Sequence, residues 1–350
     1  MLSRYDWAGP SSRYRFYQFF PHLEKENFDI SISPLFNEKY VRNLYSDKRS
    51  TKFINPLSAY LKRTYKLLFA RNYDLVWMEK EALPWVPASI EKFLCKKSIP
   101  YVIDYDDAVY HRYDQNSNSL VRAALSKKID KLMAFSTVVI AGNQYIAEHA
   151  ERNEVKKIQI LPTVVDTNFY VEKEPLINES FTIGWIGSPS TSRHINVAIP
   201  ALNRLCQNND VRFSAIGALG KDVTEIPGHL ISWKEESEIQ ELRSFDVGIM
   251  PLPNTPWEKG KCGFKLIQYM ACGLPVIASP VGMNEEIIDH GENGFLATNT
   301  KEWVKYLELL KNNPELRWKM GKVGRKKVEE CYSLQSVTPK LVKLLREAVA

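Results

Sequence analysis

Short apolar runs rich in β-branched residues alternate along the chain with segments whose apolar residues recur at helical spacing. In the first half the predicted strands are the opening MLSRY and residues 28–33, 74–78, 100–104, 136–141 and 157–161. Helical spacing is clear between them, for example over 119–134. Strands that alternate with helices predict a parallel sheet with right-handed crossovers, and therefore an α/β fold.

The pattern weakens over residues 162–180, a polar stretch with two prolines that we interpret as a linker. A second alternating series follows, so we expect two doubly wound domains over 1–170 and 171–330 and a closing helix within 331–350. The predicted strands are 181–186, 211–216, 229–232, 246–250, 274–278 and 294–297, and the predicted helices are 193–207, 236–244, 264–272 and 283–290, with helical pattern over 301–349.

The composition is that of a soluble globular protein, with 44% hydrophobic and 25% charged residues among 350. No apolar run approaches the roughly 18 residues of a membrane helix, and the opening MLSRYDWAGPSS lacks the order of a signal peptide. The five cysteines are scattered, and none is spaced for zinc. We therefore expect reduced thiols, a cytoplasmic location and no metal site.

Positive charge is concentrated in residues 40–72, which hold eight Lys or Arg residues and one acid, interleaved with aromatic and aliphatic side chains. Such a segment suits an anionic membrane surface. A solvated helix face explains it equally well, and nucleic acid is the other polyanion that such a segment would suit. We expect no nucleic-acid partner.

The loop after the strand predicted over 181–186 reads GSPSTSRHI. A glycine lets the backbone approach a ligand, and hydroxyls, a helix N-terminus and an arginine together make an anion site. The alternative is a well-capped helix with a solvated arginine. The candidate residues are Gly187, Ser188, Ser190, Thr191 and Arg193.

A second loop precedes the helix predicted over 264–272, and it carries Lys261 and Lys265 around Cys262, Gly263 and Phe264. Cations at a helix N-terminus oppose the helix dipole by about 0.3–1 kcal/mol each. Two such exceptions indicate a bound anion or a compensating carboxylate. The alternative is a surface loop that is merely basic.

Polar residues also follow the first-half strands. Three carboxylates after the strand 100–104 are candidates to orient or deprotonate an acceptor hydroxyl, to bind metal, or to cap a helix. The candidates of this half are Gly9, Ser12, Arg13, Glu79, Lys80, Asp104, Asp106 and Asp107.

The order GWIGSPST…R, FDVGIMPL, KCGFKLIQYMACGLPVIASPVG and GENGFLA resembles the C-terminal domain of family 4 retaining glycosyltransferases of the GT-B fold. The pieces GPSSRYR, DYDDAVYHRY and AGN are similar to a branch of that family making bacterial surface polysaccharides. The resemblance implies two Rossmann-like domains facing across a cleft, the first on the acceptor side and the second binding a nucleotide sugar. It also implies that the C-terminal helix within 331–350 packs back on the first domain.

The family's signature helix carries two glutamates, E-x7-E, and here both are replaced, by Gly260 and Gln268. The resemblance places Gln268 at the nucleotide ribose and leaves Glu258 as the substitute for the carboxylate that reaches the donor sugar. It places Trp233 near the base. The family's diphosphate-binding Arg and Lys fall on Ser188 and Arg193, so Lys261 and Lys265 are expected to restore the lost charge.

The activity implied is sugar transfer from a UDP- or GDP-linked donor to a glycan or lipid-linked acceptor, with retention and without metal or cofactor. A peripheral position on the inner face of a membrane follows from the lipid-linked acceptor. Two alternatives stay open: a degenerate GT-B partner subunit without turnover, motivated by Gly260 and Gln268, and a sugar-nucleotide epimerase or a phosphorylase on the same fold. A dinucleotide dehydrogenase is disfavoured, because no G-x-G-x-x-G is in place.

Overall fold

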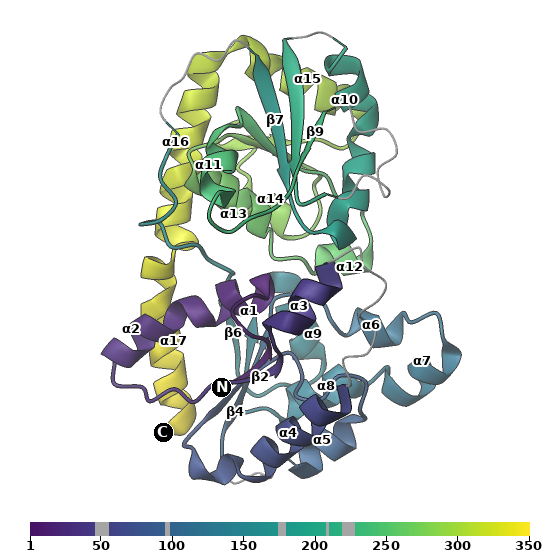
Figure 1. Cartoon of the computed structure of the whole chain (residues 1–350), viewed down its shortest axis with the longest axis vertical. Helices are drawn as coiled ribbons and strands as arrows, with labels where there is room; N and C mark the ends of the chain where they lie inside the picture. The colour runs from purple at the N-terminus through teal and green to yellow at the C-terminus, as the bar shows by residue number, and fades with distance from the viewer. Residues whose placement is uncertain (46–55, 95–98, 174–179, 208–209, 219–227) are drawn as a thin grey trace. The chain divides into compact units, whose positions relative to one another are not determined.

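The structure is a computed structural model that describes residues 1–350 except 46–55, 95–98, 174–179, 208–209 and 219–227. The chain forms two compact units (Figure 1). The first unit comprises Met1–Thr163, Gly260–Cys262 and Val337–Ala350, and the second comprises Val164–Lys259 and Gly263–Ser336. Among the described residues, none of the helices is both long and apolar enough to cross a membrane.

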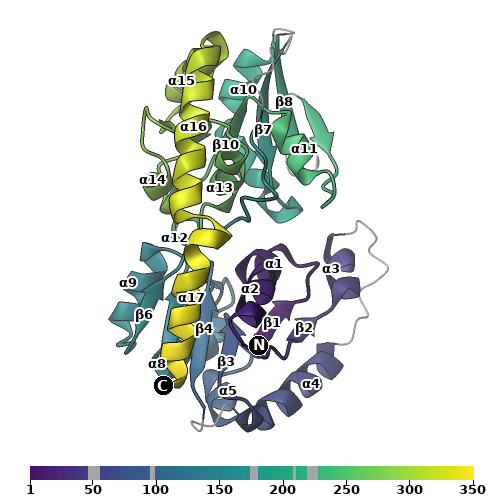
Figure 2. The same ribbon diagram turned by 90° about the vertical axis from the view of Figure 1, so that its left-hand side faces the viewer.

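The first unit is built on a parallel sheet of six strands in the order β2-β1-β3-β4-β5-β6. Its central strands β3, β4 and β5 are buried along their whole length, as expected for a sheet covered by helices on both faces (Figure 2). The strands are β1 (Leu2–Tyr5), β2 (Ser33–Phe36), β3 (Val76–Glu79), β4 (Tyr101–Tyr105), β5 (Val138–Ala141) and β6 (Ile158–Ile160).

Two sequence predictions in this unit are wrong. The second strand is Ser33–Phe36 and not 28–33, because Phe36 pairs with Tyr5 of β1 and the edge position tolerates Pro34. The segment predicted as one helix over 119–134 forms two helices. The first ends at Leu125 and the second begins at Lys128. The helices are α1 (Pro10–Arg15), α2 (Phe20–Lys25), α3 (Glu38–Tyr45), α4 (Pro56–Leu68), α5 (Ala88–Leu94), α6 (His111–Asp114), α7 (Ser119–Leu125), α8 (Lys128–Phe135), α9 (Gln144–Arg152) and α17 (Leu334–Val349, in this unit from Val337), with 3-10 turns η1 (Tyr17–Phe19) and η3 (Ala70–Asn72).

The second unit has a parallel sheet of six strands in the order β12-β11-β10-β7-β8-β9. The prediction of an α/β fold made of two doubly wound parallel sheets is confirmed. The strands are β7 (Phe181–Ile186), β8 (Val211–Ile216), β9 (His229–Ile231), β10 (Val247–Met250), β11 (Val276–Ala278) and β12 (Gly294–Leu296).

The helix predicted over 193–207 is instead a 3-10 helix followed by a short α-helix, because Pro189 and Pro200 each begin a new helical segment. The pattern over 301–349 is divided into three helices, the first break falling at Asn313 and Pro314. The helices are η4 (Pro189–Val197), α10 (Ile199–Leu205), α11 (Glu238–Arg243), α12 (Pro256–Lys259), α13 (Phe264–Ala271), α14 (Met283–Ile287), α15 (Thr300–Asn312) and α16 (Pro314–Cys331).

In each sheet the strand order reverses at one point, between β1 and β3 in the first unit and between β7 and β10 in the second. Ligands of open α/β sheets bind outside the carboxyl ends of the strands at such switch points. In the second unit Tyr269 of α13 lies over this point. Its hydroxyl accepts from the N–H of Ile186 at 2.8 Å, and its ring fills the space that a side chain at Gly248 would need.

Candidate functional site

The carboxyl end of β7 continues into a tight turn. The N–H of Ser188 donates to Oγ1 of Thr191 at 3.1 Å, and that hydroxyl donates back to the Ser188 carbonyl at 2.9 Å. The Ser188 and Ser190 hydroxyls are 2.9 Å apart, and Arg193 is exposed. The backbone at Gly187 lies against the Trp185 ring, where a Cβ would sit 2.4 Å from a ring atom. The predicted hydroxyls therefore shape this turn.

Lys265 lies in the first turn of α13, with its Nζ 4.5 Å from the centre of the fully buried Trp185 ring. A cation over an indole face is attracted by the ring quadrupole. The helix begins after Gly263, whose φ of 65° and contact with Ile287 leave no room for a side chain. The ring of Trp185 thus offsets part of the unfavourable placement of a lysine at a helix N-terminus.

A buried carboxylate that the sequence analysis did not select receives three hydrogen bonds in the second unit. Oε1 of Glu238 accepts from the Tyr170 hydroxyl and from Nε2 of Gln268, both at 2.9 Å. Its Oε2 accepts from Nε1 of Trp233 at 2.5 Å. Gln268 also donates to Tyr170 at 3.0 Å. Gln268 is therefore held by protein groups, and Glu238 fixes the indole of Trp233, which is 36% exposed.

Trp233 follows β9, beside the ends of the two neighbouring strands. A Cβ at Gly217, just after β8, would lie 3.4 Å from Cβ of Trp233 and 2.2 Å from the carbonyl oxygen of Gly187. The predicted donor-side residues Gly187 and Trp233 are thus brought to one edge of the sheet.

Glu258 is buried on α12. Its Oε1 lies 3.1 Å from Nε2 of His194, which is also buried, and its other oxygen accepts from the Thr255 hydroxyl. His194 lies in η4, which follows β7, whereas Glu258 lies in α12, which follows β10. The carboxylate therefore has two partners from its own unit.

In the first unit the predicted residues Lys80 and Asp106 form a buried ion pair, with Nζ 2.7 Å from Oδ1. Ser11 donates to the same carboxylate and accepts from Lys80 at 3.1 Å. Burial alone would raise the pKa of Asp106, but Lys80 and the Ser11 hydrogen bond outweigh it and lower that pKa. Burial alone would lower the pKa of Lys80, which Asp106 and Glu79 instead raise.

Glu79 ends β3, and its Oε2 accepts from the Ser12 hydroxyl and from the N–H of Arg4, both at 2.7 Å. Burial raises the pKa of this carboxyl. Gly9 begins α1, where a Cβ would lie 2.4 Å from that of Tyr5. The predicted residues Gly9, Ser12 and Glu79 therefore surround the carboxyl end of β1.

Asp104 is paired with an arginine, since Nε of Arg15 lies 2.6 Å from its Oδ1. Burial nevertheless raises the pKa of Asp104 to about 6, and the Arg15 charge only partly opposes this. Arg13 is buried with its guanidinium 4.8 Å from the Tyr14 ring centre. Asp107 is the half-buried member of the acidic run.

Gly260 and Lys261 belong to the first unit. Nδ2 of Asn143 donates to both of their carbonyl oxygens, at 2.9 and 3.2 Å, while its Oδ1 caps α9. A Cβ at Gly260 would lie 2.2 Å from that of Ala108. Burial raises the pKa of the neighbouring Cys262 thiol to about 11. Close packing thus explains why glycine, and not glutamate, occupies position 260.

Sequence reasoning did not select Glu238, Tyr170, His194 and Asn143 as site residues. Each meets its partner across a large sequence distance, for example 98 residues between Tyr170 and Gln268. Local spacing carries no signal of such pairs.

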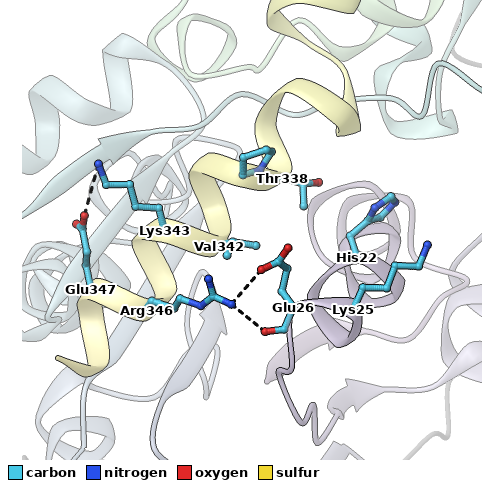
Figure 3. A pocket seen from close by; sticks show the side chains of 9 residues that line it. His22, Lys25, Glu26, Thr338, Val342, Lys343, Arg346 and Glu347 are labelled. Atoms are coloured by element: carbon cyan, nitrogen blue, oxygen red, sulfur yellow. Dashed lines mark hydrogen bonds and ion pairs between the residues drawn. The ribbon is translucent and has the colours of Figure 1, made fainter.

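A pocket of about 490 Å³ lies elsewhere in the first unit, between α2 and α17, where Arg346 donates to Glu26 at 3.0 Å (Figure 3). None of the predicted site residues lines it.

Comparison with known families gives a match that lies mostly in the second unit. Residues 180–313 match the family model described as "Glycosyl transferases group 1". This segment is therefore similar to the group 1 glycosyltransferases. It includes the switch point between β7 and β10, the turn at Gly187, the Glu238 cluster and the whole of α13.

Curated proteins that are similar to this chain include a glycosyltransferase of capsular polysaccharide synthesis. The chain is 25% identical over 198 residues to the capsular polysaccharide biosynthesis glycosyltransferase CapM of Staphylococcus aureus, which covers 53% of this chain and 51% of CapM. It is 34% identical over 76 residues to spore coat protein SA of Bacillus subtilis, covering 21% of this chain and 20% of that protein. The matches thus span about half of the one relative and a fifth of the other.

Among solved structures, the chain is similar to Anabaena HepE in complex with UDP and glucose. The TM-score is 0.65 with 17% identity, over 94% of this chain and 89% of that chain. At this identity the likeness concerns the fold, and it confirms the GT-B prediction.

Proposed function

We propose that this protein is a glycosyltransferase that moves a sugar from a nucleotide diphosphate sugar to a glycan or lipid-linked acceptor in surface polysaccharide synthesis. The observation that carries the proposal is the placement of Lys265 over Trp185 at the carboxyl end of β7, beside the close backbone approach at Gly187. It lies inside the segment matched by the glycosyltransferase model.

This arrangement suits a leaving nucleoside diphosphate. Negative charge grows on the diphosphate as the glycosidic bond breaks, and a preorganised cation stabilises that charge most where water is excluded. Lys265 supplies the cation, with Lys261 as the second candidate. Backbone N–H groups around Cys262, Gly263 and Phe264 are candidate donors to the phosphates, and Ser188, Ser190, Thr191 and Arg193 belong to the turn that follows β7.

Trp233 is the residue that we assign to the nucleobase. Its indole is fixed through Nε1 by Glu238 and is 36% exposed, so a ring face is available for stacking at low entropic cost. Gln268 is the candidate for the ribose. UDP in the similar Anabaena structure supports a uridine donor, and GDP is the other donor tested below.

Retention at the anomeric carbon, independence of metal and membership of family 4 are part of the same proposal. Among the acidic candidates, Asp107 is half-buried and is our choice for the group that meets the acceptor hydroxyl. Asp106 and Glu258 are each held by buried partners, and we assign them to orienting their surroundings. Glu79, Lys80, Asp104, Ser12, Arg13 and Gly9 form the acceptor-side surroundings in the first unit.

A degenerate partner subunit without turnover is the second candidate function. It is favoured by one observation, that Gln268 is engaged by Glu238 and Tyr170 where the resembling family has a glutamate. A lipid-linked acceptor would place either protein at the cytoplasmic face of a membrane.

Thermal unfolding with a panel of UDP-, GDP- and dTDP-sugars, followed by product analysis, tests the proposal. A donor at 100 times its dissociation constant should stabilise the fold by about 2.7 kcal/mol. Lys265→Gln should weaken that donor about tenfold or more, whereas the exposed Lys301→Gln should not. Binding without turnover would favour the partner subunit, and the absence of both would contradict the proposal.

A further inference from the structure

The helix α4 presents an apolar stripe to the outside of the first unit. Leu57, Leu61, Tyr65 and Leu68 follow one another at helical spacing and are 60%, 63%, 59% and 46% exposed. Residues at this spacing share one face of a helix. The stripe continues into Phe69, which is 43% exposed and whose ring packs at 40° to that of Tyr65, with 4.5 Å between ring centres.

The opposite side of α4 is anchored in the unit. Arg63 is buried and donates to the carbonyl oxygens of Ser3 and Ser33 at 2.6 and 2.8 Å, and Leu67 is buried in the core. Arg63 is therefore a structural residue and not part of a basic surface. The positive charge that residues 40–72 can present to a partner is smaller than their sequence count by this one residue. The anchoring also fixes which face of α4 points outward.

The charges next to the stripe are positive. Lys62 and Lys66 follow Leu61 and Tyr65, and α4 contains no acidic residue. The neighbouring helix α5 lies beside α4 (Figures 1 and 2) and exposes Ile90 and Phe93, at 46% and 73%, with an exposed lysine, Lys92, between them. Other basic residues of the 40–72 segment lie at least partly outside the described residues.

We propose that the outer face of α4, defined by Leu57, Leu61, Tyr65, Leu68 and Phe69, docks on an anionic lipid bilayer. Leucine and aromatic side chains next to lysines, with no carboxylate, are the composition of helices that lie in a membrane interface. Tyrosine is favoured at that depth, and the lysines meet the headgroup phosphates. This surface goes beyond the proposed function and does not depend on it, because docking requires neither donor nor turnover.

Co-sedimentation of the full chain with vesicles tests the inference. We expect binding to phosphatidylcholine vesicles with about one third phosphatidylglycerol, weaker binding at high salt, and little binding to phosphatidylcholine alone. Leu61→Glu combined with Tyr65→Glu should lower the partition coefficient about tenfold or more. The matched control is Leu120→Glu, which changes a residue that is 76% exposed on α7 of the same unit and should leave binding unchanged.

Circular dichroism and donor binding of each variant verify that it is folded. Absence of vesicle binding by the wild-type chain, or an equal loss in Leu120→Glu, would overturn the inference. So would light scattering that shows a dimer disrupted by the α4 changes without vesicle binding, because the stripe would then be covered by a second copy. Loss of donor turnover with intact vesicle binding would count against the proposed function alone.

Discussion

Nε2 of Gln268 donates a hydrogen bond to Oε1 of Glu238 at 2.9 Å, joining α13 to α11 inside the second unit. Both side chains are buried, and the same carboxylate also holds Tyr170 and Trp233. An amide at position 268 can donate to this carboxylate, whereas a carboxylate at that position cannot. The glutamine that replaces the glutamate of the resembling family therefore has a hydrogen-bond partner on another helix, Glu238 of α11.

Gln268→Glu should therefore lower the free energy of unfolding by about 2 to 4 kcal/mol, because a second carboxylate would be buried against Glu238 and the hydrogen bond that Nε2 donates would be lost. The loss should shrink as the pH falls toward 5, where the added carboxyl can keep its proton. Urea denaturation at two pH values measures this. The exposed Gln240→Glu on α11 is the control, and equal stability of the two variants would contradict the structural role of the pair.

Gly260→Ala should destabilise the first unit by about 1 to 3 kcal/mol, since the new Cβ would lie 2.2 Å from that of Ala108. In an Ala108→Gly background the same change should cost less, because the nearest clashing atom is gone and only backbone atoms of residue 108 stay close, the nitrogen at 2.8 Å being the nearest. A double-mutant cycle of unfolding free energies measures the coupling between the two positions. Additive effects would show that the two residues do not pack as described.

Glu81 and Glu91 are both buried, and both form an ion pair with Lys128. The Lys128 Nζ lies 2.6 Å from an oxygen of Glu81 and 2.8 Å from an oxygen of Glu91. Burial raises the pKa of Glu91 to about 7, and Lys128 opposes this only in part. The folded state then binds the proton more tightly than the unfolded state, whose glutamate pKa is about 4.3.

Between pH 4.5 and 7 the Glu91 contribution to stability should consequently decline, by roughly 3 kcal/mol in total. Glu91→Gln should flatten this part of the pH profile. Denaturation midpoints measured across that range check it, and a wild-type profile with the same slope as the variant would refute the assignment.

Asp106→Asn and Asp107→Asn should have different consequences. Asn at 106 would leave the buried Lys80 without its nearest carboxylate and with only Glu79 at 3.9 Å, so stability should fall by about 2 kcal/mol or more along with activity. Asn at the half-buried Asp107 should change stability by less than about 0.5 kcal/mol but lower kcat by about 100-fold, as for a lost acid–base group. Turnover of the donor identified in the panel measures kcat. Full activity of Asp107→Asn would show that the Asp107 carboxylate does not act on the acceptor hydroxyl.

The sequence predicted the architecture well where the local pattern is strong. β7 was predicted with the observed limits, because FTIGWI is a short, mostly apolar run between polar turns, which is typical of a buried strand in an α/β series. The second strand was misplaced, because FDISIS alternates as a strand should while the actual β2 contains Pro34, tolerated only because tertiary pairing puts it at the sheet edge.

The sequence by itself determined the strand and helix series, the strand-end loops and the residue types in them, since these follow from periodicity and turn chemistry within a few positions. Only the tertiary structure decided which groups neutralise one another. Arg15 meets Asp104 across 89 residues, and Gln268 meets Glu238 across 30. The tertiary structure also decided where the two lysines around the start of α13 lie. Lys261 belongs to the first unit, and Lys265 lies over Trp185 in the second. Such pairs depend on which strands lie side by side, and this order is created by the folded sheet and not by any local spacing.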